Sequence, residues 1–161
     1  MKFVYRLAAA AAFCSMALSS AQAVVIGTVD SENSIPFSNS VPVYRQIYNA
    51  SSFSSAMLIY DITFYDSNNS GGTLTGGTFK LFLSTVSTAV GNLNINLLEM
   101  GSDAALVYDG SLPSLAGGKL NFDLFSPFQY NPAGGNLLLT AWWQQDGSVP
   151  TAVCTDNLNA G

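Results

Sequence analysis

The sequence contains no histidine, and only 9% of its 161 residues are charged. Without imidazole, the chain has neither a Ser-His-Asp nor a Cys-His arrangement, and it lacks the usual nitrogen ligand of zinc sites. It also has no G-x-S-x-G motif, P-loop or dinucleotide-binding fingerprint. We therefore expect a non-enzymatic protein that uses no cofactor.

Cysteine is equally scarce, because the chain has only Cys14 and Cys154. Cys14 falls in an N-terminal segment that we expect to be removed, which leaves Cys154 alone. A single thiol cannot form an intramolecular disulfide, so sheet packing has to hold the fold together. We expect Cys154 to act as a small buried apolar side chain, with intermolecular pairing as the alternative.

Long apolar runs are missing too. The run Leu7–Leu18 is shorter than the roughly 20 residues that a membrane-spanning helix needs. It follows the positive residues Lys2 and Arg6 and precedes an A-x-A site that ends at Ala23. This order is typical of a secretory signal peptide. We predict a Sec-type signal peptide over residues 1–23, cleavage after Ala23, and a location outside the cytoplasm.

The remaining segment, residues 24–161, has the length of one domain and no transmembrane span. It keeps three basic and all 10 acidic residues, so its net charge is −7. Nucleic acids and anionic membrane surfaces are bound through clusters of basic residues. We therefore expect neither of them to be a partner.

Alternating apolar and polar residues dominate this segment. In Met57–Tyr65, the residues Leu58, Tyr60, Ile62 and Phe64 fall on one side, while Asp61, Thr63 and Tyr65 fall on the other. This period of two predicts a strand with one buried face. Further strands are expected over Val24–Val29, Val43–Asn49, Thr78–Val86, Leu93–Glu99, Ala105–Asp109, Lys119–Phe125 and Asn136–Trp143.

Asn136–Trp143 is the most apolar of these strands, and we expect it to be central. The segments Asp66–Gly77 and Ser126–Gly135 are rich in turn-forming residues and are expected to be a long turn and a corner. Short strands separated by such turns predict an all-β fold. We expect an antiparallel β-sandwich, jelly-roll-like or immunoglobulin-like, after the signal-peptide helix.

Carboxylates are the residues that remain for acid–base chemistry. The candidates are Asp61, Asp66, Glu99, Asp103, Asp109 and Asp123. No spacing pairs any two of them, and on alternating strands such residues are typical of a solvated face. Asp66 and Asn68 could offer oxygens to calcium, but the EF-hand spacing is absent, so a polar turn is the preferred interpretation and no metal site is predicted.

Aromatic residues could serve sugar binding, in which exposed rings stack on pyranose faces. Trp142 and Trp143 are adjacent on a strand, so they point to opposite faces, one of them toward the core. Tyr44, Tyr48 and Tyr65 could line a surface in the same way. A carbohydrate-binding module is thus one alternative, and a structural or adhesive subunit that assembles through sheet edges is another.

Several phrases resemble a known family when they are taken together. They are RQIYNASSF, GTFKLFLSTVSTAVGNLN, VYDGSLPSLAGG and SPFQYNPAGGNLLL, spread over Tyr44–Leu139. This stretch resembles secreted bacterial proteins that carry a PEP-CTERM sorting signal. The resemblance implies export, brief anchoring by a C-terminal signal and association with exopolysaccharide-producing bacteria. It supplies no catalytic residues.

The sorting signal of that family is a proline- and glutamate-containing motif, an apolar span and an arginine cluster. Here Val149-Pro150 is followed by Thr151-Ala152, without the span or the cluster. We therefore expect the chain to be truncated within its last β-region. We interpret it as a secreted, non-enzymatic cell-surface or extracellular-matrix protein, with an extracellular polysaccharide or another surface protein as its partner.

Overall fold

The computed structural model describes residues 23–26, 43–65, 77–94, 97–114, 116–144 and 154–156. Residues 1–22 of the predicted signal peptide and residues 66–76 of the predicted turn Asp66–Gly77 lie outside the described residues. The described elements are β1 (Val43–Tyr48), η1 (Ala50–Ser52), β2 (Met57–Tyr65), β3 (Thr78–Val86), β4 (Ala105–Ser111), β5 (Lys119–Tyr130), η2 (Pro132–Gly134), β6 (Asn136–Gln144) and β7 (Cys154–Asp156).

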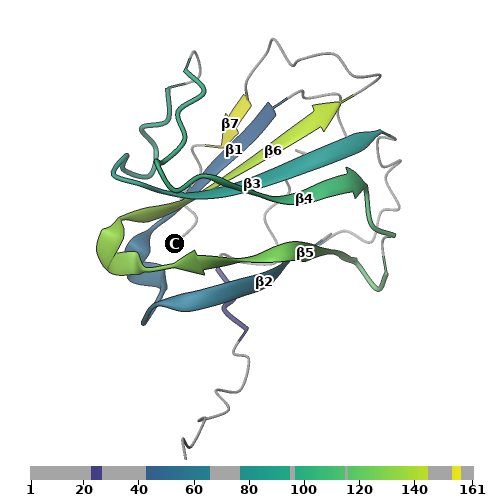
Figure 1. Ribbon diagram of the computed structural model, residues 1–161, viewed down its shortest axis with the longest axis horizontal. Helices are drawn as coiled ribbons and strands as arrows, with labels where there is room; N and C mark the ends of the chain where they lie inside the picture. The colour runs from purple at the N-terminus through teal and green to yellow at the C-terminus, as the bar shows by residue number, and fades with distance from the viewer. Residues whose placement is uncertain are drawn as a thin grey trace, which may run out of the picture.

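These strands form two sheets, which confirms the all-β prediction. One sheet has five strands in the order β4-β3-β6-β1-β7, and the other pairs β2 with β5. Neighbouring strands are antiparallel except for β1 and β7, which run parallel. Figure 1 shows β2 and β5 as a separate layer beneath the larger sheet.

A single apolar core joins the two sheets. Phe79, Leu81 and Leu83 of β3 and Phe122 and Tyr130 of β5 are buried in one cluster. The sheets also meet directly where the rings of Tyr108 and Phe122 pack edge to face, with centroids 5.0 Å apart. Each such large apolar side chain contributes about 1.5–3 kcal/mol when it is fully buried.

Strand β6 is central, as its apolar sequence predicts. It pairs with β1 along one edge and with β3 along the other. Leu137, Leu138, Leu139 and Ala141 are all buried. Because both faces of β6 are covered, its nearly continuous apolar sequence stabilises the fold by burial.

The prediction of which β2 residues are buried is only partly correct. Ile62 and Phe64 pack against the core, but Leu58 and Tyr60 are 51% and 54% exposed. Met57 and Ile59 contact the core in their place. The pairing register with β5 shifts between Ile59 and Asp61. Such a bulge moves the alternation by one residue and so exchanges the two faces of the strand.

Strand β5 is longer than the predicted Lys119–Phe125. Residues 126–130, expected within a turn-rich corner, continue the strand to Tyr130, and Phe128 pairs with Ile59. Pro127 lies in the irregular part of the pairing, between Asp123 and Phe128. A proline is tolerated there because a bulge leaves its position without a ladder hydrogen bond.

One other strand prediction is wrong, because the described residues of the segment Leu93–Glu99 form no strand. Of the predicted strand Val24–Val29, residues 24–26 form no strand and the remainder lies outside the described residues. The short strand β7 was not predicted, and it places the backbone of Cys154 opposite Tyr44 of β1. Three residues are too few for a sequence period to show.

The buried Tyr130 gives the fold a sensitivity to alkaline pH. Its hydroxyl donates a hydrogen bond of 2.7 Å to the carbonyl oxygen of Gly135, and burial raises its pKa. Below about pH 10 the phenol is protonated in both the folded and the unfolded chain. Above it the unfolded chain releases the proton first, so the free energy of unfolding falls as the pH rises.

We expect Tyr130→Phe to lose about 1 kcal/mol of stability at neutral pH, because the hydrogen bond is lost. Above about pH 10 its stability should fall less steeply than that of the wild type. Urea unfolding at a series of pH values measures both effects. Tyr65→Phe, which changes an exposed ring, is the control. Parallel alkaline curves for Tyr130→Phe and wild type would contradict the assignment.

Candidate functional site

Residues 87–94 and 97–104 lie against the face of the five-stranded sheet that points away from the core. A second small cluster lies beneath this segment, with Ile47, Leu93 and Leu138 buried in it. The side chain of Arg45 on β1 is also fully buried here. It is the largest fully buried side chain among the described residues.

Arg45 binds the covering segment through backbone carbonyls. Its Nη1 donates to the carbonyl oxygens of Leu97 at 2.6 Å and Asn94 at 3.3 Å, and its Nη2 donates to that of Glu99 at 2.6 Å. Burial lowers the pKa of the guanidinium, and the Glu99 carboxylate partly offsets this. These carbonyls turn toward a side chain instead of a neighbouring strand, which is why Leu93–Glu99 is not a strand despite its alternation.

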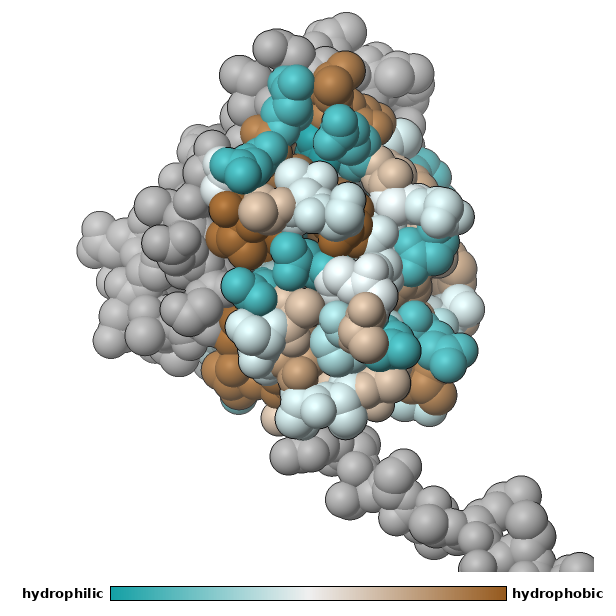
Figure 2. All heavy atoms as spheres, turned by 90° about the vertical axis from the view of Figure 1, so that its left-hand side faces the viewer, coloured by the Kyte–Doolittle hydropathy of each residue, from teal (hydrophilic) through white to brown (hydrophobic). Residues whose placement is uncertain are grey.

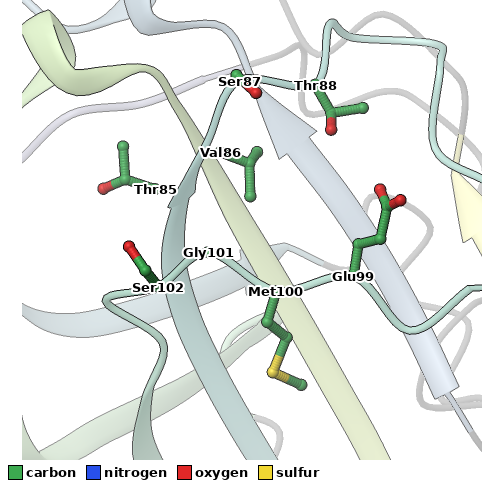
Figure 3. Close-up of a pocket in the computed structure, with 8 residues that line it drawn as sticks. All are labelled: Thr85, Val86, Ser87, Thr88, Glu99, Met100, Gly101 and Ser102. Carbon is green, nitrogen blue, oxygen red and sulfur yellow. The ribbon is translucent and has the colours of Figure 1, made fainter.

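An open hollow of about 430 Å³ lies where this segment returns past the end of β3. Residues 85–88 form one wall and residues 99–102 the other, with the carboxylate of Glu99 directed toward Thr88 (Figure 3). Glu99 is the only ionisable residue in the lining, beside serine and threonine hydroxyls. The lining therefore offers no pair of carboxylates for acid–base catalysis.

Backbone packing shapes this hollow. The Gly101 N–H donates to the hydroxyl of the buried Ser84 at 3.1 Å, and the Thr85 N–H donates to Oδ1 of Asp103 at 2.7 Å. A Cβ atom on Gly101 would lie 2.0 Å from the carbonyl oxygen of Thr85. Seen from the end of the molecule in Figure 2, hydrophilic and hydrophobic side chains are interspersed.

Of the five aromatic residues considered for sugar binding, Tyr65 is exposed on β2, and the other four do not share a surface. Tyr44 and Trp143 are buried in the core, so their ring faces are not available. Tyr48 is half-buried, and its hydroxyl and that of Tyr44 both donate to Oε1 of Gln46. Trp142 lies on the opposite face of β6 and packs on Phe82, with ring centroids 4.8 Å apart.

The candidate carboxylates are dispersed except for one pair. Asp109 forms an ion pair with Lys80, and Asp103 caps the Thr85 N–H. Asp61 and Asp123, in contrast, lie directly opposite each other in the pairing of β2 with β5. The calcium candidates Asp66 and Asn68 lie outside the described residues. Among the residues that the structure describes, no three His, Cys, Asp or Glu side chains form a metal-binding group.

Asp61 and Asp123 are exposed, whereas the adjacent residues of their strands, Ile62 and Phe122, pack in the core. We call the exposed side of the β2–β5 sheet, which is turned away from the five-stranded sheet, the outer face. Figure 1 shows the two layers. The cross-strand pairs on this face are Leu58 with Gln129, Asp61 with Asp123, Thr63 with Asn121 and Tyr65 with Lys119. The exposed rings of Tyr60 and Phe125 lie beside them at the bulge. The sequence alone does not predict this surface, because the bulge that exposes Tyr60 has no clear sequence signal.

Comparisons with protein-family models, curated proteins and solved structures gave no match for this chain. Within the described ranges, no helix is both long and apolar enough to cross a bilayer. Among the described residues, the exposed aromatic side chains are Tyr60, Tyr65 and Phe125, and all three lie on β2 and β5.

Proposed function

We propose that this chain is an exported, non-enzymatic protein of the cell surface or extracellular matrix, built as a jelly-roll-like or immunoglobulin-like β-sandwich. Two sheets that share one apolar core support the sandwich. The signal-like N-terminus, the low charge content and the resemblance to PEP-CTERM proteins support export and an exopolysaccharide-associated role.

The geometry of the outer face is the observation that supports a non-enzymatic function. Its carboxylates face each other on an open sheet surface. Glycoside hydrolysis instead uses carboxylates that flank a bound substrate. Ligand pockets, in turn, are concave and mostly apolar. The described hollow is elsewhere and holds one ionisable side chain. An open face with exposed rings and hydrogen-bonding groups suits binding to an extended partner.

Processing of the N-terminus tests export. When the full chain is produced in a bacterial host with a Sec pathway, N-terminal sequencing should find a mature protein that begins at Val24, in the medium or at the cell surface. Ala23→Arg should block cleavage, because the site requires a small residue. Wild-type protein that keeps Met1 and stays in the cytoplasm would overturn the proposal.

A further inference from the structure

Three exposed aromatic rings mark the outer face of the β2–β5 sheet. Phe125 is 63% exposed, Tyr60 is 54% exposed and Tyr65 is 45% exposed. Scattered exposed rings need no explanation, but these lie on two paired strands. Tyr60 and Tyr65 are separated along β2 by roughly 17 Å at about 3.4 Å per residue. Flat rings over this distance suit a ligand that repeats a flat apolar surface.

A row of polar side chains lies between the rings. Thr63 Oγ1 donates to Asn121 Oδ1 at 2.7 Å, and Asn121 Nδ2 donates to Asp123 Oδ1 at 2.7 Å. Asp61 lies opposite Asp123 in the register. Lys119 supplies a positive charge, but its Nζ is at the far end of the row, 5.4 Å from the ring centroid of Tyr65.

The facing carboxylates make the centre of this row negatively charged. Like charges directly opposite each other on paired strands destabilise a sheet. Among the described residues, neither Asp61 nor Asp123 takes part in an ion pair. A positive group bound between them would relieve this repulsion, whereas a polyanion would add to it. The face is therefore complementary in charge to a cationic ligand.

The arrangement also argues against a protein as the partner. Protein interfaces have an apolar centre and a polar rim. On the outer face, two facing carboxylates, an amide and a hydroxyl lie between the rings of Tyr60 and Phe125 at the bulge and the ring of Tyr65 at the end of β2, so charged and polar groups occupy the area between the rings. Burying two facing carboxylates under a protein surface would be costly. A sugar chain leaves them hydrated and offers hydroxyl groups to them.

We propose that the outer face binds a polysaccharide whose sugars carry free amino groups. Pyranose rings stack on Tyr60 and Phe125, an ammonium group lies between Asp61 and Asp123, and hydroxyl groups bond with Asn121 and Thr63. This inference deepens the proposed function and rests on it, because an exported non-enzymatic protein at an exopolysaccharide-containing surface meets such polymers.

Two oligosaccharides with the same backbone test the inference. A glucosamine hexamer carries amino groups, and an N-acetylglucosamine hexamer is neutral. Isothermal titration calorimetry of purified residues 24–161, at a mildly acidic pH where the amines are protonated, should show tighter binding of the glucosamine hexamer. The preference should decline as salt is added, because exposed charges are screened.

Matched variants locate the site. Asp61→Asn and Asp123→Asn should each weaken glucosamine binding by about two- to fivefold, and Tyr60→Ala by roughly two- to tenfold. Glu99→Gln and Leu98→Ala, which change an exposed carboxylate and an exposed apolar side chain in the 97–104 segment, should bind like the wild type. Circular dichroism confirms that each variant is folded. The Asn variants remove the carboxylate repulsion and should fold well.

Each outcome is decisive. Equal binding of both hexamers, unchanged by Asp61→Asn, would overturn the amino-sugar assignment, as would no binding of either hexamer by folded wild-type protein. Mass spectrometry of the hexamers after incubation with the protein tests the non-enzymatic proposal independently of the amino-sugar inference. Shortened hexamers would overturn the non-enzymatic proposal, while a variant-sensitive preference for glucosamine would still support the site.

Discussion

Replacing Arg45 with Met should lower the free energy of unfolding by about 3–5 kcal/mol, because two short hydrogen bonds from a charged donor, each typically worth about 1.5–3 kcal/mol, are lost. The methionine fills part of the same space but leaves the carbonyls of Leu97 and Glu99 without their donor. The segment 87–104 should then separate from the sheet. Urea unfolding measures the global loss, and limited proteolysis between Ser87 and Ala104 detects the local one.

Two comparisons make this result specific. Arg45→Lys keeps the charge but lacks the fork of donors that reaches separate carbonyls, so it should recover only part of the lost stability. Lys80→Met removes a partly exposed ion pair with Asp109 on the same sheet and should cost no more than about 1 kcal/mol. If Arg45→Met were as stable as Lys80→Met, the guanidinium would not hold the segment.

Gly135→Ala should destabilise the fold by about 2–4 kcal/mol, because two costs add. The residue has φ of +140°, a conformation that is nearly restricted to glycine, and a Cβ atom would lie 2.5 Å from the carbonyl oxygen of Val86. The carbonyl oxygen of Gly135 also accepts the hydrogen bond from the Tyr130 hydroxyl. Backbone atoms cannot move aside as a flexible side chain can, so the corner before β6 has to distort.

The neighbouring glycine is the matched control for this change. Gly134→Ala would place a Cβ atom 3.5 Å from Cγ2 of Thr85, which is ordinary contact, and its backbone has no positive φ. It should change stability by less than about 1 kcal/mol. Thermal unfolding followed by circular dichroism compares the two variants. Equal losses from Gly134→Ala and Gly135→Ala would show that the close approach to Val86 is unimportant.

Strands with long, regular alternation could be predicted from the sequence. Met57–Tyr65 and Thr78–Val86 have the predicted bounds, and Asn136–Gln144 extends its prediction by one residue. The period of two reports local geometry directly. It fails for Leu93–Glu99, because the carbonyls of that segment are bound by Arg45, which lies far away in the sequence. Nothing within the segment itself indicates that contact.

The candidate site was less predictable because it depends on register. Asp61 and Asp123 were both recognised as strand carboxylates, but only the pairing of β2 with β5 places them face to face. The bulge then exposes Tyr60, which strict alternation would have placed on the buried side. Register follows from contacts between distant segments, which a single sequence does not display.

The central position of β6 has a consequence for the timing of folding. Val43 at the start of β1 pairs with Trp142, and β3 pairs with the same strand on its other edge. Proteins dominated by such non-local pairings fold slowly. The larger sheet cannot join β1 to β3 until residue 144 has left the ribosome. The larger sheet therefore stays incomplete during most of the chain's synthesis, and an incompletely folded chain is what the proposed passage through a secretion channel requires.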